Sequence, residues 1–150
     1  MCIRDRAVPV LYLRRSLPIE ELVAYYLAAD VMLVTPFRDG MNLVAKEYVA
    51  SRKTETGVLV LSEFTGSAVE LDRAVLVNPH DIDGMAATIE NAIAMPRQEQ
   101  TRRMRSLRQR VRKRTVYTWA SDFTHALDAE QPRPSSATMQ LPIGNNPPTS

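Results

Sequence analysis

The sequence predicts an α/β fold, a Rossmann-like parallel sheet with flanking helices, and three observations support this prediction. Short apolar runs such as Val31–Val34 and Val58–Leu61 have the length of buried strands. Segments with helical periodicity separate these runs, and this alternation favours a parallel sheet with both faces covered by helices. The connections are short, so right-handed crossovers make the sheet Rossmann-like.

The first elements alternate between the two periodicities. After Pro18, a good first helical residue, apolar residues recur at helical spacing. The expected elements in chain order are a strand over Ala7–Leu13, a helix over 18–29, a strand over Val31–Val34, a helix over Asn42–Arg52 and a strand over Val58–Leu61.

The later elements complete the sheet and then change character. A loop around Gly66, with room for one helical turn, leads to a strand over Ala74–Val77. Asp81 can cap a helix over 83–94. Pro96 then opens a long helical region with a bend near Thr115, and the Pro-rich, polar composition of 129–150 predicts a disordered tail.

Composition excludes several classes of protein. The 150 residues suit one ordinary domain or a piece of a larger one. The single Cys cannot form an internal disulfide, so a reducing cytoplasm fits best. No apolar run approaches the roughly 18 residues of a membrane span, and Met1–Arg6 is not followed by the apolar stretch of a signal peptide.

The positive charge is concentrated in one predicted helix. The net charge is +2, yet eight of the 19 Lys and Arg residues fall within Arg102–Arg114, a window without an acid. Such a cluster makes nucleic-acid binding a remote alternative. No recognisable nucleic-acid-binding module surrounds it and no aromatic residues alternate with the arginines, so we expect no nucleic-acid partner.

The segment Thr35–Glu47 is the strongest candidate for a site. It lies where the carboxyl end of a predicted strand turns into a helix, the edge at which open parallel sheets bind ligands. Gly40 has no Cβ and lets a ligand approach the backbone. The free amides of Met41 to Val44, with the helix dipole, would form an anion site suited to phosphate.

Two acidic residues flank this predicted anion site. Glu47 lies four residues after Leu43, about 6 Å along a helix axis, so a ribose attached to a bound diphosphate would lie near its carboxylate. Asp39 could accept hydroxyls from a second sugar on the other side. The geometry suggests a sugar-nucleotide donor, but spacing alone leaves open that Asp39 merely caps the helix and that Glu47 is a solvated surface residue.

The stretch Asp39–Glu47 resembles the donor-binding signature of trehalose-6-phosphate synthases. It also resembles the acidic-x7-Glu spacing of retaining glycosyltransferases with the B-type two-domain fold. The similarity runs from about Val8 to Leu127. It includes the segments Ala29–Pro36, Lys46–Ala50, Val58–Phe64, Val77–Pro79, Met95–Pro96 and Trp119–Ala120.

The resemblance implies glucosyl transfer from UDP-glucose to glucose 6-phosphate with retention, forming trehalose 6-phosphate. It implies that Asp39 holds donor-glucose hydroxyls and that Glu47 holds the ribose. The resemblance also implies that the same sugar contacts the backbone amides of Gly40, Met41 and Asn42. The amides of Leu43 and Val44 would hold the diphosphate. On a looser motif, Leu17 would contact the uracil. Members need neither a cofactor nor a metal, since the helix end and basic side chains neutralise the diphosphate.

The resemblance also divides the chain. Residues 1–6 match nothing in the family and suggest a non-native leader, 7–128 would be a partial nucleotide-sugar-binding domain, and 129–150 the tail. Family members are much longer, and they carry acceptor groups and an Arg/Lys pair for the departing UDP in segments without a counterpart here. We therefore assign no catalytic residue to the chain and expect the chain alone to be inactive.

Other readings of the sequence are weaker. A glucosylglycerol-phosphate synthase, which shares the donor site, and a non-catalytic regulatory synthase-like domain are the alternatives to the expected activity. The motif Asp81-Ile82-Asp83 has the spacing of a metal site, but helix capping explains it. Residues expected to be structural or without a catalytic role are His80, His125, Cys2, Trp119 and Phe123. The sequence is compatible with a homo-oligomer.

Overall fold

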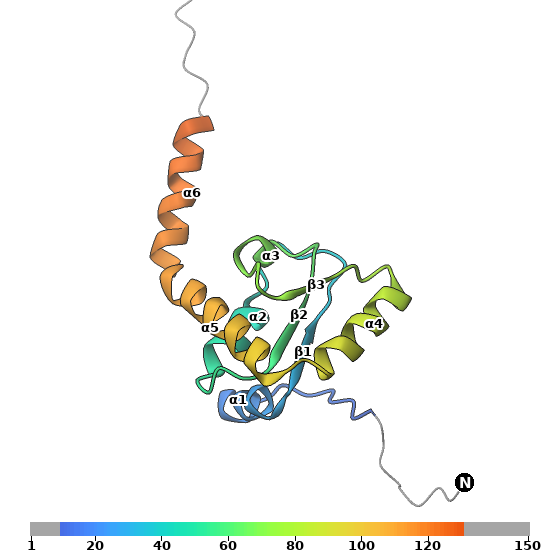
Figure 1. Ribbon diagram of the computed structural model, residues 1–150. Coiled ribbons are helices and arrows are strands. Elements are labelled where there is room, and N and C mark those ends of the chain that lie inside the picture. The colour runs from blue at the N-terminus through green and yellow to red at the C-terminus, as the bar shows by residue number, and fades with distance from the viewer. Residues whose placement is uncertain (1–9, 131–150) are drawn as a thin grey trace, which may run out of the picture. The chain divides into compact units, whose positions relative to one another are not determined.

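Residues 10–130 contain a parallel sheet, as predicted, but it has three strands where the sequence predicted four (Figure 1). The computed structural model describes residues 10–130, and these fall into two parts, 10–114 and 115–130, described separately below. The strands β1 (Val31–Val34), β2 (Val58–Ser62) and β3 (Val75–Val77) lie in that order. Val31 pairs with Val58, and Val60 with Val75.

Helices cover both faces of this sheet. Along the central strand β2, Leu59 and Leu61 face one core, while Val58 and Val60 face the other. Because successive side chains of a strand point to opposite faces, this continuous apolar run serves two cores. The first core is closed by α1 (Ile19–Ala28), α2 (Leu43–Ser51), α3 (Ser67–Glu70) and α5 (Arg97–Lys113), and the second by α4 (Ile82–Ile93).

The predicted strand over Ala7–Leu13 is wrong where it can be checked. Residues 7–9 lie outside the described range, and Val10–Leu13 form no strand. Val10, Leu11 and Tyr12 are each more than 70% exposed. The run has the composition of a strand, but β propensity acts through pairing and packing, and this segment has neither among the described residues.

The remaining elements agree with the prediction to within a few residues. Asp81 caps α4, since its Oδ1 accepts a hydrogen bond from the Gly84 amide at 3.0 Å. The helical turn expected near Gly66 is α3. The predicted bend near Thr115 is the break between α5 and α6 (Val116–Glu130). The helix α6 includes the first two residues of the predicted tail, whereas the rest of that tail and the predicted leader 1–6 lie outside the described residues.

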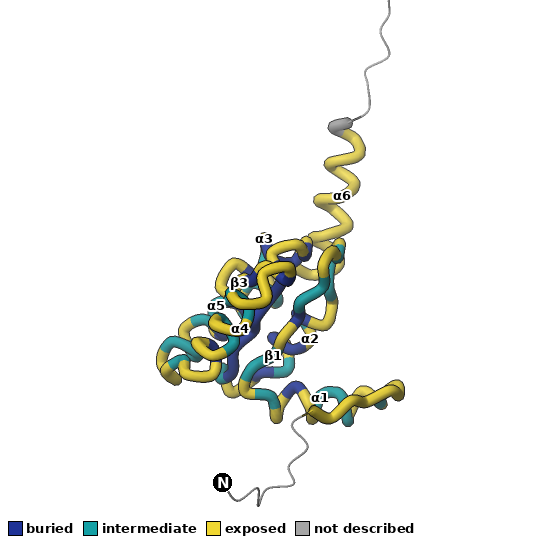
Figure 2. Tube along the Cα trace, turned by 90° about the vertical axis from the view of Figure 1, so that its right-hand side faces the viewer, coloured by how far each residue is buried: buried dark blue, intermediate teal, exposed yellow. Residues whose placement is uncertain are grey.

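The helix α6 carries an exposed apolar stripe. Trp119 and Phe123 stack with ring centroids 5.4 Å apart, and both remain about half exposed. Exposure extends along the helix over residues 116–128 (Figure 2). None of the helices within residues 10–130 combines the length and the apolar character that membrane crossing requires.

The arginine-rich helix α5 packs against the sheet domain and forms ion pairs with it. Met104 and Leu107 are buried in the first core, each 1% exposed. The surrounding arginines pair with acids or carbonyls of the same part of the chain. These pairs are Arg102 and Arg103 with Glu99, Arg105 with Glu55, Arg108 with the Arg52 carbonyl, Arg110 with Asp72, and Arg114 with Glu70. Most of the arginines within Arg102–Arg114 therefore bind groups of the same domain.

Candidate functional site

Two loops meet at the carboxyl edge of the sheet. The loop after β1 pairs with the loop after β2 through an isolated bridge between Asp39 and Thr65. The Gly66 amide donates to the Asp39 carbonyl at 2.9 Å, and the Asp39 amide donates to the Phe64 carbonyl at 3.3 Å. A Cβ on Gly66 would collide with the Gly40 carbonyl oxygen. This requirement for Gly66 was missed by the sequence analysis, because a loop glycine alone does not show which backbone approaches it.

Asp39 and Asn42 clamp the turn that precedes α2. Asp39 Oδ1 accepts hydrogen bonds from the amides of Met41 at 3.1 Å and Asn42 at 3.2 Å. Its Oδ2 accepts from Asn42 Nδ2 at 2.9 Å. The Asn42 side chain, followed by the Met41 amide, holds the pKa of Asp39 below its ordinary value. The carboxylate therefore stays ionised, with part of its acceptor capacity directed at its own loop.

The helix cap is Asn42, not Asp39. Asn42 Oδ1 accepts a hydrogen bond from the Ala45 amide at 2.9 Å, and its φ of 55° lies in the left-handed region that Asn tolerates better than most residues. The sequence analysis left capping by Asp39 open, and the structure gives that role to its neighbour. Since Met41 and Asn42 direct their amides to Asp39, their predicted contact with a sugar stays a prediction.

Two amides at the start of α2 retain the geometry of an anion site. Leu43 and Val44 are the first residues of the helix, so their N–H groups precede the helical hydrogen-bond ladder. No acceptor within residues 10–130 forms a hydrogen bond with either N–H group. Both residues are exposed, Leu43 by 58% and Val44 by 42%. These two amides are the ones that the sequence analysis reserved for a diphosphate.

Glu47 stands one turn further along α2 and is exposed. Its Oε2 accepts a hydrogen bond from the Tyr26 hydroxyl at 3.1 Å. Tyr26 lies on α1 and is 5% exposed, and burial followed by the hydrogen bond to Glu47 raises its pKa to about 12. Both side chains line a groove of about 610 Å³ between α1 and α2. Sequence reasoning missed this partner, although a buried Tyr on the inner face of a helix usually needs one.

Arg52 is a second residue that the sequence analysis missed. Its guanidinium is buried, and Nη1 donates to the carbonyls of Tyr26 at 3.2 Å and Leu27 at 2.6 Å. Its Nε donates to the Thr56 carbonyl at 2.6 Å. A cation that donates to the orphan carbonyls at the end of α1 complements the helix dipole. Arg52 thereby fixes the end of α1 against α2, the helix that carries Glu47.

The sequence analysis also named Leu17 and His80. Leu17 is partly buried in the segment ahead of α1. Within residues 10–130 it makes no hydrogen bond to the loop after β1 or to Glu47, so its uracil contact stays a prediction. His80 is exposed beside Phe37 and Phe64, at ring distances of 4.8 and 5.7 Å. The described part of the chain holds no group of three His, Cys, Asp or Glu residues arranged for a metal.

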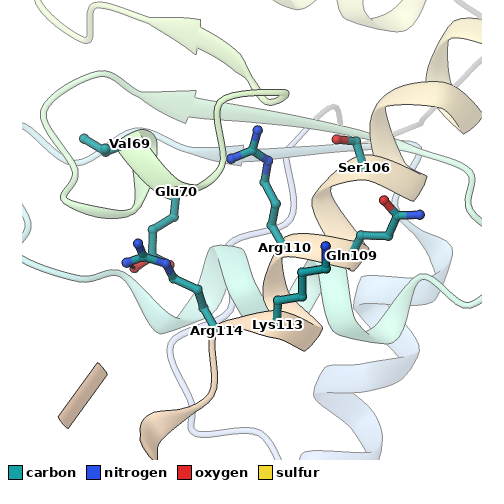
Figure 3. A pocket seen from close by; sticks show the side chains of 7 residues that line it. All are labelled: Val69, Glu70, Ser106, Gln109, Arg110, Lys113 and Arg114. Atoms are coloured by element: carbon teal, nitrogen blue, oxygen red, sulfur yellow. Dashed lines mark ion pairs between the residues drawn. The ribbon is translucent and has the colours of Figure 1, made fainter. Parts of the chain in front are cut away.

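A basic hollow of about 460 Å³ lies between α3 and α5 (Figure 3). Figure 3 shows Glu70 facing Arg114, with the side chains of Lys113 and Arg110 beside them. Glu70 also pairs with Lys46 at 2.7 Å, and Arg110 pairs with Asp72 at 2.8 Å. Most of the charged residues that line the hollow form ion pairs within the same part of the chain. This hollow is therefore not the anion site that the sequence predicted.

Comparison with known proteins gives the family. Residues 3–129 match the family model described as glycosyltransferase family 20. The chain is 60% identical over 121 residues to the trehalose-6-phosphate synthase of Mycobacterium leprae, which covers 81% of this chain and 24% of that protein. The chain thus spans about a quarter of the length of the curated relatives it matches.

Solved structures agree. An α,α-trehalose-phosphate synthase (UDP-forming) from Burkholderia xenovorans in complex with glucose-6-phosphate has a TM-score of 0.74 at 46% identity, over 80% of this chain and 27% of that one. An Escherichia coli structure bound with UDP-2-fluoro glucose has a TM-score of 0.74 at 41% identity, over 83% and 28%. These likenesses confirm the predicted B-type fold and the resemblance read from Asp39–Glu47. The chain belongs to glycosyltransferase family 20.

Proposed function

We propose that the chain is the donor-binding part of an α,α-trehalose-phosphate synthase (UDP-forming), which transfers glucose from UDP-glucose to glucose 6-phosphate with retention. The observation that carries the proposal is the start of α2, where the amides of Leu43 and Val44 are available and the carboxylate of Glu47 is exposed one turn away. The names of the relatives support this activity over that of a glucosylglycerol-phosphate synthase or a regulatory domain.

Each part of the donor has a matching group. The diphosphate would accept hydrogen bonds from the Leu43 and Val44 amides, aided by the dipole of α2. Glu47 would accept hydrogen bonds from the two ribose hydroxyls. Asp39, which keeps unused lone pairs on Oδ2, would accept hydrogen bonds from hydroxyls of the glucose. Leu17 would lie against the uracil, and the helix end would take the place of a metal.

The remaining substrate belongs to other parts of the protein. Since the chain spans about a quarter of its relatives, we assign glucose 6-phosphate binding and the neutralisation of departing UDP to segments outside it. The cytoplasm is the proposed compartment, because both substrates are phosphorylated metabolites and the single Cys is compatible with reducing conditions.

Calorimetric titration of UDP and ADP into the 150-residue chain tests the donor site. We expect UDP to bind more tightly than ADP and Glu47→Ala to weaken UDP binding about tenfold or more, through the loss of hydrogen bonds to a charged group. Glu63→Ala is the matched control, because Glu63 is an exposed acid at the same edge of the sheet. Equal affinity of Glu47→Ala and the parent chain for UDP would contradict the proposal.

A chimera tests the reaction. In it, the matched segment of the Mycobacterium leprae synthase is replaced by the corresponding residues of this chain. We expect this chimera to form trehalose 6-phosphate from UDP-glucose and glucose 6-phosphate. A folded chimera that binds UDP but gives no such product would show that this segment serves another reaction.

A further inference from the structure

We propose that Tyr26 is a positioning residue for Glu47 and thereby a determinant of the preference for a ribonucleotide over a deoxyribonucleotide donor. This inference rests on the proposed function, which assigns the ribose hydroxyls to Glu47. It adds a residue on α1 to a site whose proposed diphosphate and sugar contacts lie on α2 and the loop before it.

The contact joins a buried group to an exposed one. The Tyr26 hydroxyl donates to Glu47 Oε2 at 3.1 Å. Tyr26 is 5% exposed, whereas Glu47 is exposed. A glutamate on a helix surface ordinarily samples several rotamers, so a hydrogen bond from a fixed donor restricts it before a ligand arrives.

Tyr26 itself is held from two sides. Its ring packs edge-to-face on Tyr48, with centroids 6.3 Å apart and an interplanar angle of 81°. The buried guanidinium of Arg52 binds the carbonyls of Tyr26 and Leu27 at the end of α1. Because Tyr26 is held in this way, the flexible Glu47 side chain adjusts to Tyr26 rather than the reverse.

The bond leaves Glu47 able to receive a diol. A carboxylate has about four lone-pair sites, and Tyr26 occupies one of them. Within residues 10–130 Glu47 forms no ion pair, whereas the neighbouring Lys46 pairs with Glu70. The remaining lone pairs can accept hydrogen bonds from both ribose hydroxyls. A deoxyribose has only one of these hydroxyls and would leave one lone pair without its hydrogen bond. A site built around such hydrogen bonds discriminates against a ligand that lacks a hydroxyl.

The hydroxyl remains a donor over a wide pH range. Burial and the adjacent Glu47 charge raise the pKa of Tyr26 to about 12. Four titratable residues lie near Tyr26: Glu47 accepts its hydrogen bond, Tyr48 packs on its ring, Arg52 binds its backbone carbonyl, and Lys53 lines the same groove. The positioning of Glu47 is therefore expected to be independent of pH through the neutral and mildly alkaline range.

A purely structural role for Tyr26 can be separated from positioning. The Tyr48 hydroxyl donates to the Ala29 carbonyl at 3.4 Å and so also connects α2 to α1, without touching Glu47. Tyr48→Phe removes that connection and keeps the ring. It is the matched control for Tyr26→Phe, which keeps the packing on Tyr48 and removes the donor to Glu47.

The test compares UDP with 2′-deoxy-UDP by calorimetric titration of the full 150-residue chain. In the parent chain we expect UDP to bind more tightly, and Tyr26→Phe to reduce the ratio of the two affinities about 3- to 10-fold, the effect of one hydrogen bond. Tyr48→Phe should leave the ratio unchanged, and in Glu47→Ala the two nucleotides should bind alike. Circular dichroism of each variant confirms that the helices are retained.

The outcomes separate the two proposals. If Glu47→Ala removes the discrimination but Tyr26→Phe does not change it, positioning by Tyr26 is refuted and the proposed function stands. If Glu47→Ala has no effect, the assignment of Glu47 fails. The chimera supplies a second readout, in which Tyr26→Phe should raise KM for UDP-glucose with little change in kcat, because the ribose does not react. An unchanged KM there would overturn the inference even if the isolated chain bound no nucleotide.

Discussion

Asn42 combines a cap with a backbone conformation that few residues adopt. Its φ is 55°, and its side chain both caps Ala45 and donates to Asp39. Replacement by Ala loses the cap and keeps a Cβ in the left-handed region without the local hydrogen bonds that let Asn adopt it, whereas Gly has no Cβ and tolerates that region. We expect Asn42→Ala to lower the free energy of unfolding by about 1–2 kcal/mol and Asn42→Gly by less. Urea unfolding checks this order, and an Ala variant as stable as the Gly variant would contradict it.

Asp39, in the turn before α2, makes the stability of the fold depend on pH, and the sign of this dependence follows from its pKa. Hydrogen bonds from the Asn42 side chain and the Met41 amide lower its pKa in the folded chain. The resulting stabilisation is complete above the ordinary carboxyl pKa of about 3.9 and is lost as the pH falls through the lower folded value. NMR titration of the Asp39 carboxyl should therefore give a midpoint below about 3.9. Asn42→Gly should move that midpoint upward, and a midpoint above the ordinary value would refute the assignment.

Two loops act as one element at the carboxyl edge of the sheet. Gly66 has an ordinary backbone conformation, but any Cβ there would meet the Gly40 carbonyl. Gly66→Ala must therefore push away the loop after β1 and, with it, Asp39 and the start of α2, where the diphosphate would bind. We expect it to weaken UDP binding about tenfold or more, because small displacements of positioning groups have large effects. Val69→Ala, an exposed change on α3, is the control, and equal UDP affinities for the two variants would count against coupled loops.

The helix α5 is held by its apolar face more than by its ion pairs. Leu107 is 1% exposed, so Leu107→Ala should cost about 2–5 kcal/mol through lost burial and a cavity. Arg105 is 61% exposed where it pairs with Glu55, and Arg105→Ala should cost at most about 1 kcal/mol. Urea unfolding at low and high salt measures both. A cost for Arg105→Ala that matches that of Leu107→Ala, and vanishes in salt, would reverse this ranking.

Across the whole molecule, local patterns predicted elements well and partnerships poorly. The runs 31–34 and 58–61 could be assigned to strands because both are short and continuously apolar, and the second is buried on both faces of the sheet. The run 10–13 has similar composition but no partner strand in the described chain, and composition cannot supply one. Likewise, spacing placed Leu43, Val44 and Glu47 on one helix start. The contacts of Glu47 with Tyr26 and of Arg52 with α1 join residues 21 to 26 positions apart, which no local pattern specifies.

The largest prediction concerns the difference between binding and turnover. The described chain holds the groups that we propose to bind the donor, and it spans about a quarter of the length of its curated relatives. Stabilising the departing UDP and orienting the acceptor need preorganised charges, and removal of such groups lowers rates by orders of magnitude. We therefore expect the 150-residue chain to bind UDP-glucose and yet to form trehalose 6-phosphate far more slowly than the chimera. A coupled assay of UDP release, with both proteins at equal concentration, measures this. Comparable rates would show that the chain holds the catalytic groups itself.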